Sequence, residues 1–277
     1  MKITLLGTGS PLIDPNRAGP STLVQGAEAT FLIDAGRGVQ LRLVGAGAAP
    51  SMLSAVLLTH LHSDHITDLN DMITMHWLMT QEKGTLRIVG PPGTQQVVDG
   101  ALAMLGPDIG YRVAHHEQLV KGPQVEVTEI EPGDQLESGG CTILAGKTNH
   151  SPVEPTVGYR ISDGTHSVVL GGDGIPCETL DELVSGADAY VQTAMREDMV
   201  LAVPNPMFHD VLEYHSTVVQ AAQTAAKGGV GTLLLTHYVP APPVGDEAEW
   251  AAGVSEHFDG ALVVGPDLTV VDLAAGS

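Results

Sequence analysis

The chain has 277 residues, of which 43% are hydrophobic and 16% are charged, so it can bury a sizeable core and is not disordered. Its 33 acidic residues outnumber its 12 lysines and arginines, which gives a formal net charge of −21. A surface this negative repels phosphate backbones, so we expect no nucleic acid among the partners. The sequence has no apolar run of about 18 residues and no secretion signal, which predicts a cytoplasmic protein without a membrane helix.

The predicted elements alternate between strands and helices. In the first half we expect strands at residues 3–6, 21–24, 30–33, 53–58 and 86–89, and helices at 39–44, 66–80 and 92–105. Residues 113–130 are expected to be rich in strand. In the second half we expect strands at 142–145, 167–170, 189–192 and 232–235, helices at 180–185 and 218–227, and an irregular loop at 199–210. No linker interrupts the pattern, which predicts one domain over residues 1–277 with two packed sheets and helices outside.

Three imidazoles and one carboxylate follow the buried strand at residues 53–58 within the run from Thr59 to His65. His60 and His62, two residues apart, can project to one side and bind one ion, while Asp64 and His65 can bind a second. Imidazole nitrogens and carboxylate oxygens are the ligands that a borderline cation such as zinc prefers. The end of a strand is also where sites form in α/β folds, so this run predicts a metal site.

Further candidates stand at other strand ends. His150 follows the strand at 142–145, and His237 repeats the strand-then-histidine arrangement near the C-terminus. Asp173 lies on a glycine turn, where it could bridge two cations or be a simple turn aspartate. His215 comes just before a helix, and Asp34 is either a solvated turn carboxylate or a partner that orients a metal ligand.

The helix expected at 66–80 carries the large apolar residues Met72, Met75 and Trp77. Such a stripe is usually part of a core. Because it directly follows the metal-site residues, it could instead form one wall of an apolar substrate pocket, together with Met199 and Phe208 from the loop at 199–210.

This set of motifs resembles the metallo-β-lactamase superfamily, and within it the branch of ribonuclease Z and the arylsulfatase-like phosphodiesterases. The resemblance covers nearly the whole chain and rests on Asp34, HLHSDH at 60–65, NHSPVEPTVGYR at 149–160, GGD at 171–173, HST at 215–217 and LLTHY ending at Tyr238. It implies an α/β fold of the αββα type, with two packed mixed β-sheets and helices on the outer faces.

The resemblance also implies two zinc ions, for which Mn²⁺ or Fe²⁺ could substitute. One ion would be held by His60, His62 and His150, the other by Asp64, His65 and His237, with Asp173 bridging both. Asp64 and His215 would be the catalytic residues, His215 as the acid/base that helps the leaving group depart. Two divalent cations about 3.5–4 Å apart can hold a bridging hydroxide that attacks an ester.

Two departures from ribonuclease Z bear on the activity. Thr193 stands in Gln192-Thr193-Ala194 where those relatives have a glutamate that orients the acid histidine, so Glu213 or Asp210 would have to replace it. The chain also lacks a long glycine- and lysine-rich arm of the kind that grips tRNA in ribonuclease Z. With the net charge of −21, this disfavours tRNA processing.

The sequence therefore predicts a dinuclear zinc hydrolase that uses a metal-bridging hydroxide to cleave a small, aromatic or apolar phosphodiester or sulfate ester. A carboxylic ester, lactone or amide is the alternative substrate, and a tRNA 3′-end endonuclease is the least favoured activity. The expected partner is a small molecule, with neither nucleic acid nor membrane. A homodimer is also expected, because dimers are common among the relatives.

Overall fold

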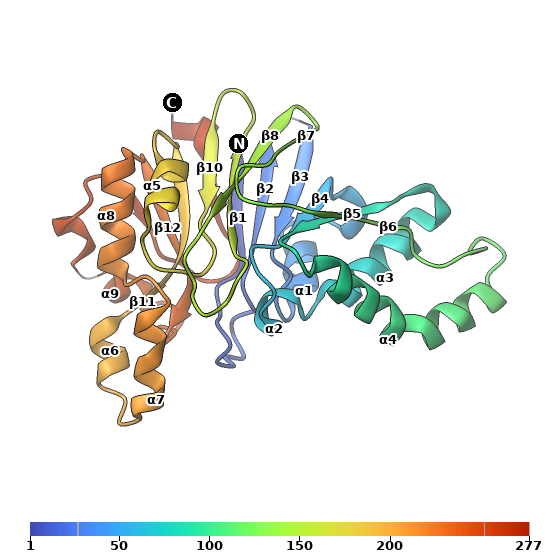
Figure 1. Cartoon of the computed structure of the whole chain (residues 1–277), viewed down its shortest axis with the longest axis horizontal. Coiled ribbons are helices and arrows are strands. Elements are labelled where there is room, and N and C mark those ends of the chain that lie inside the picture. The colour runs from blue at the N-terminus through green and yellow to red at the C-terminus, as the bar shows by residue number, and fades with distance from the viewer. Residues whose placement is uncertain (27, 252, 277) are drawn as a thin grey trace.

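Two β-sheets of seven strands each pack face to face at the centre of the structure, and helices cover both outer faces (Figure 1). The computed structural model describes residues 1–26, 28–251 and 253–276, within which these strands lie. This architecture confirms the predicted αββα sandwich. Within the described ranges, every helix is too short or too polar to cross a membrane.

The first sheet has the strand order β14–β1–β2–β3–β4–β5–β6. Its strands are β1 (Lys2–Gly7), β2 (Ser21–Gly26), β3 (Ala29–Ile33), β4 (Ala55–Leu57), β5 (Leu86–Gly90), β6 (Val125–Glu129) and β14 (Thr269–Asp272). Neighbours from β14 to β3 pair antiparallel, and those from β3 to β6 pair parallel. The helices α1 (Val39–Gly45), α3 (Leu69–Thr80) and α4 (Thr94–His115) pack on its outer face.

The second sheet has the order β13–β12–β11–β10–β9–β8–β7. Its strands are β7 (Gln135–Ser138), β8 (Cys141–Lys147), β9 (Val157–Ser162), β10 (Ser167–Leu170), β11 (Ala189–Met195), β12 (Thr232–Val239) and β13 (Ala261–Val263). Strands β10 to β13 pair parallel, and β7 to β10 pair antiparallel. The helices α5 (Glu178–Val184) and α8 (Val218–Gly228) pack on its outer face.

Short helices and 3₁₀ turns connect these elements. They are α2 (Ser63–Ile66), α6 (Glu197–Leu201), α7 (Pro206–His209), α9 (Glu247–Trp250), η1 (Pro50–Met52), η2 (Gln81–Lys83), η3 (Asp210–Glu213), η4 (Val254–Glu256) and η5 (Leu273–Gly276).

The alternation of side chains along the strands produces three apolar layers. The layer between the sheets includes Ile3, Phe31, Tyr159 and Leu234, all fully buried. Two further layers separate each sheet from its outer helices. Burying an apolar side chain of this size contributes about 1.5–3 kcal/mol, so the layers hold the strand ends firmly in place.

One edge of the sandwich collects the loops that carry the candidate site. The parallel strands β3 and β4 of the first sheet and β10, β11 and β12 of the second end in such loops. Gly172, after β10, packs directly against Thr59, after β4, so both sheets contribute to the same edge. In Figure 1 this edge faces downward, where α2 lies.

The prediction of a strand-rich segment at 113–130 is wrong for its first part. Helix α4 continues through Pro107 to His115, and only β6 at Val125–Glu129 is a strand. A proline inside a helix removes one main-chain hydrogen bond and normally ends the helix. Only Thr94 and Val98 of α4 are buried, so the carbonyl freed by Pro107 lies on a solvent-facing part of the helix.

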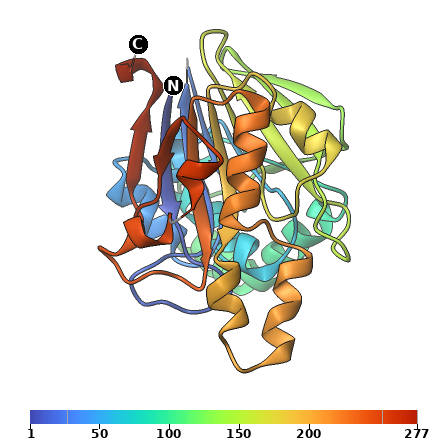
Figure 2. The ribbon, with the colours of Figure 1, turned by 90° about the vertical axis from the view of Figure 1, so that its left-hand side faces the viewer.

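The segment expected as an irregular loop at 199–210 is instead a helical hairpin. Helices α6 and α7 and the turn η3 follow one another here, and Figures 1 and 2 show the hairpin projecting from the body beside the site edge. Asn205 caps α7 by accepting from the Met207 N–H, and Pro206 occupies the first helical position. Proline favours a helix start, so the two prolines here mark a boundary between helices.

Candidate metal centre

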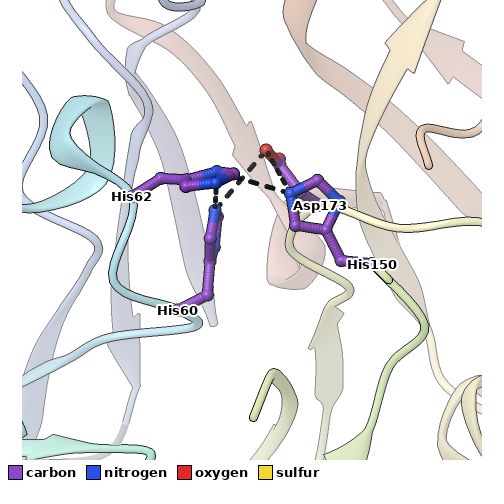
Figure 3. A group of neighbouring side chains, drawn as sticks. All are labelled: His60, His62, His150 and Asp173. Atoms are coloured by element: carbon purple, nitrogen blue, oxygen red, sulfur yellow. Dashed lines mark hydrogen bonds and ion pairs between the residues drawn. The ribbon is translucent and has the colours of Figure 1, made fainter. Parts of the chain in front are cut away.

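Three histidines and one aspartate point at a common centre (Figure 3). His60 and His62 come from the loop after β4, His150 from the loop after β8, and Asp173 from the glycine turn after β10. His62 Nδ1 lies 3.1 Å from His60 Nε2 and 3.4 Å from His150 Nε2. Asp173 Oδ2 lies 3.7 Å from His60 Nε2 and 3.9 Å from His150 Nε2.

A second group lies directly beside the first. His237 Nε2 is 3.3 Å from Asp64 Oδ2, and His65 Nε2 is 3.6 Å from the same oxygen. Both ring nitrogens are also 3.4 Å from Asp173 Oδ2. Asp173 therefore lies between the two groups, in the place of a ligand that two cations could share.

Buried partners on the far side fix the ring orientations of this site. Asp34 Oδ2 accepts from His65 Nδ1 at 2.8 Å, and the same carboxylate accepts from the Thr59 N–H at 2.8 Å. Thr59 Oγ1 also lies 3.1 Å from His60 Nδ1. Asp34 is only 5% exposed, so of its two interpretations the structure supports the partner that orients a ligand. The orienting role of Thr59 was missed, and its only sequence signal is a hydroxyl directly before His60.

The three imidazoles of the first group are held in their neutral form. Burial lowers the pKa of His60 well below its ordinary value, and nearby His65 adds to this shift. Burial likewise lowers the pKa of His62, and that of His150 to about 4. A neutral imidazole offers a lone pair, so these side chains can coordinate a cation at neutral pH without losing a proton.

The second group carries opposite charges in the metal-free protein. Burial lowers the pKa of His65 and His237, but carboxylates outweigh it: Asp173 and Asp34 raise the pKa of His65 well above its ordinary value, and Asp173 and Asp64 raise that of His237. Burial would raise the pKa of Asp173, yet His237 and His65 hold it well below its usual range. Protons here supply the positive charge that a cation would bring.

Orphaned polar atoms show that these residues fit a divalent metal. Among the described residues, four fully buried side-chain atoms form no hydrogen bond, and two of them are His65 Nε2 and Asp173 Oδ1. Buried polar atoms without a partner are rare, because each costs about 1–3 kcal/mol. Both belong to side chains that face the centre, and nitrogen and carboxylate donors are a set typical of zinc and related cations.

His215 lies at the margin of this centre and is 8% exposed. Its Nε2 is 3.2 Å from Asp173 Oδ2, and its Nδ1 is 3.3 Å from the Val211 carbonyl. The sequence predicts that Glu213 or Asp210 orients His215, whereas in the structure the Val211 carbonyl is the partner of its Nδ1. Geometry alone also groups His215 with Asp173 and His237 as a third set that could hold a metal.

The hydrogen bonds described for Thr193 go to residues other than His215. The Thr193 hydroxyl donates to the Gly172 carbonyl at 2.9 Å, and the side chain faces a cavity of about 30 Å³ that Asp34 and His65 also line. The threonine thus supports the turn before Asp173 from inside the sandwich.

The five residues suggested for a substrate pocket have different surroundings. Met72 and Trp77 are buried in or beside the core, and Trp77 Nε1 donates to the Lys121 carbonyl, so packing accounts for both. Met75 and Phe208 are half-buried, and Met199 on α6 is 40% exposed. A pocket role for these three stays a prediction.

Comparison with known proteins identifies the family. The Beta-lactamase superfamily domain matches residues 29–238. Ribonuclease Z of Mycobacterium sp. (strain KMS) is 49% identical over 277 residues, covering 100% of this chain and 97% of the relative. Ribonuclease Z of Mycobacterium bovis (strain BCG / Pasteur 1173P2) is 49% identical over 275 residues, with 99% and 98% covered.

Solved structures share the fold at lower identity. The metallo-β-lactamase fold protein YhfI from Bacillus subtilis superposes with a TM-score of 0.73 at 22% identity, over 98% of both chains. The short form of human tRNase Z gives a TM-score of 0.73 at 20% identity, over 99% of both chains. These matches confirm the predicted metallo-β-lactamase fold.

The comparisons correct two predictions. A small phosphodiester or sulfate ester as substrate is wrong, and so is the exclusion of nucleic acid, because relatives named ribonuclease Z share 49% identity over the whole chain. The exclusion used the net charge of −21, which sums over the whole surface and does not report the potential at the site. The chain is a metallo-β-lactamase-fold hydrolase, and it belongs to the β-lactamase superfamily and, within it, to the ribonuclease Z family.

Proposed function

We propose that this protein is a metal-dependent endoribonuclease that cleaves precursor tRNA at its 3′ end. The observation that carries the proposal is the 49% identity to proteins named ribonuclease Z over 277 residues. The short form of human tRNase Z has the same fold, which is consistent with the proposal. The convergence of seven candidate ligand side chains at one sheet edge supplies the chemistry that such a hydrolase needs.

We propose two divalent cations at this edge, zinc in the first place, with Mn²⁺ or Fe²⁺ as substitutes. His60, His62 and His150 would hold one ion, Asp64, His65 and His237 the other, and Asp173 both. When bound, such a pair supplies Lewis acidity for the scissile phosphate and makes water a nucleophile near neutral pH.

The chain's own residues would position the phosphate and move one proton. His215 is the proposed proton donor to the leaving oxygen, because its Nε2 faces the centre beside Asp173 without belonging to either of the two ligand groups. Asp34 and Thr59 hold the rings of His65 and His60 from behind. Asp64, predicted as a catalytic residue, is proposed to contribute to the reaction as a metal ligand.

The test is cleavage of a precursor tRNA with a labelled 5′ end and a short 3′ trailer, using protein reconstituted with Zn²⁺ or Mn²⁺. We expect one product that ends at the mature 3′ side, and a loss of about 10²–10⁴-fold in rate for His215→Ala. A single-stranded DNA of the same trailer sequence is the control substrate. Fully metal-loaded protein that leaves the precursor intact would refute the proposal.

A homodimer also remains a proposal. Exposed apolar side chains on α1, η1 and α3 support it, namely Leu41, Val44, Met52 and Met79. Light scattering of the purified protein at micromolar concentration should give about twice the 28.8 kDa mass of the chain. A monomer mass at every concentration would refute the dimer.

A further inference from the structure

Two main-chain carbonyls at the end of the α6–α7 hairpin hold two histidines of the site. The Tyr214 carbonyl accepts from His150 Nδ1 at 2.8 Å, and the Val211 carbonyl accepts from His215 Nδ1 at 3.3 Å. A carbonyl oxygen can only accept, so each Nδ1 must carry a proton. The Nε2 atoms are thereby the ones presented to Asp173.

These carbonyls are placed by a small apolar cluster of their own. Met195, Val200 and Val239 form its buried part, against which Phe208, Val211 and Leu212 pack. The cluster ties the hairpin to the ends of β11 and β12, apart from the larger cores of the sandwich. Hydrogen bonds close the hairpin from within, since His209 Nε2 donates to the Val203 carbonyl at 2.9 Å.

Among the described residues, no carboxylate is hydrogen-bonded to His215 Nδ1. The acidic neighbours Asp210 and Glu213 lie in the same turn, yet the partner of Nδ1 is the Val211 carbonyl. Thr193 is engaged with the Gly172 carbonyl. The orientation of His215 therefore depends on where the turn lies, and the turn lies where the cluster holds it.

We infer that the α6–α7 hairpin is a positioning element. Its Val211 carbonyl determines the tautomer and ring orientation of His215, and its Tyr214 carbonyl determines the tautomer and ring orientation of His150. This inference rests on the proposed function for its substrate and on the hairpin contacts for its geometry. In the cleavage step water attacks phosphorus and gives up a proton, which His215 accepts at the free Nε2 of its Nδ1–H tautomer. The bond from phosphorus to the leaving oxygen breaks, and that oxygen keeps the electron pair and takes this proton from His215 Nε2. Water supplies the new oxygen on phosphorus.

The first test does not depend on activity. Long-range ¹⁵N–¹H spectra of the zinc-reconstituted protein report which ring nitrogen carries the proton, with His215 signals assigned by their loss in His215→Ala. Wild type should show the Nδ1–H tautomer, and Val200→Ala, which weakens the cluster, should show mixed tautomers. Met207→Ala on the same hairpin is the control, because Met207 is 75% exposed and should change nothing. An unchanged His215 tautomer in Val200→Ala would overturn the inference.

The second test separates positioning from general loss of stability. A precursor RNA with sulfur in place of the bridging leaving oxygen releases a thiolate, which departs without a proton. Val200→Ala should lower kcat at least about 10-fold for the oxygen substrate, with KM unchanged, and leave the sulfur substrate near wild type. Equal losses on both substrates would overturn the inference. If Val200→Ala does not fold, Leu212→Ala at the half-buried side of the cluster takes its place.

If the protein cleaves no RNA, the proposed function fails while the spectra still decide the inference. If it cleaves RNA but the His215 tautomer is the same in Val200→Ala as in wild type, the inference fails and the proposed function stands.

Discussion

The carboxylate of Asp34 provides the sharpest test of how the metal site is held. Asp34→Asn keeps the shape of the side chain but replaces one oxygen by an amide group. Asp34 adopts a left-handed backbone conformation with φ of 61°, which asparagine tolerates well, so the substitution adds no backbone strain. The retained oxygen can still accept from the Thr59 N–H, which lies 2.8 Å from Asp34 Oδ1.

The substitution removes the acceptor of His65 Nδ1, which lies 2.8 Å from Asp34 Oδ2. An amide that donates to Nδ1 would move the ring proton to Nε2, the atom that faces the centre. Partners of this kind typically contribute 10–100-fold to metal affinity, which corresponds to about 1.4–2.7 kcal/mol. We therefore expect Asp34→Asn to bind Zn²⁺ about 10–100-fold more weakly.

The assay is a competition titration of the metal-free protein against a chromogenic chelator, followed by RNA cleavage over a range of Zn²⁺ concentrations. Because Asp34 is proposed to act only through His65, excess Zn²⁺ should restore most of the activity. Asp68→Asn is the matched control, since Asp68 is a neighbouring half-buried aspartate that accepts from the Gln40 N–H. Unchanged Zn²⁺ affinity in Asp34→Asn, or lost activity at full metal loading, would refute this reasoning.

Three further predictions follow from buried contacts. Carboxylates raise the pKa of His65 and His237 in the metal-free protein, so these rings must lose protons when a metal binds, and the affinity for Zn²⁺ should rise with pH through neutrality. Calorimetry in several buffers should show this proton release, and an affinity that does not change with pH would contradict it. Arg17→Met should cost about 3–5 kcal/mol in urea unfolding, because it removes the cation that lies 3.0 Å from the buried Glu247 carboxylate and leaves that carboxylate with neutral donors such as the Gly245 N–H. A cost under about 1 kcal/mol would count against this pair. Thr193→Val should lose about 1 kcal/mol of stability for one hydrogen bond but keep turnover, and a large loss of turnover at full metal loading would place this hydroxyl in the proton path.

The fold and the convergence of the site were predictable because both follow from patterns local to the chain. His60, His150 and Asp173 follow strands β4, β8 and β10, and His237 lies near the end of β12. The carboxyl ends of parallel strands meet at one edge of a sheet, which is where such sites form. The helix start after His215 was equally readable, since Thr217 forms a capping box with Gln220.

The structural features that the sequence does not predict depend on contacts that have no local sequence pattern. A main-chain carbonyl such as that of Val211 exists at every residue, so no sequence pattern reveals that it holds His215. The hairpin at 197–213 is held by a cluster with Val239, far along the chain. Helix α4 passes Pro107 because the helix is exposed there, and exposure is decided by tertiary packing.

The error about nucleic acid has a physical cause that the structure makes visible. At least six of the 12 lysines and arginines lie within 4 Å of a carboxylate, so charges of both signs are locally paired and the net charge does not describe the potential at any one place. The charges that matter for a scissile phosphate are those nearest to it. At physiological ionic strength the Debye length is about 8 Å, so most surface carboxylates are screened from the centre. Two divalent cations held by the seven candidate ligands would add four positive charges next to the scissile phosphate, so a net charge of −21 does not exclude the proposed cleavage of RNA.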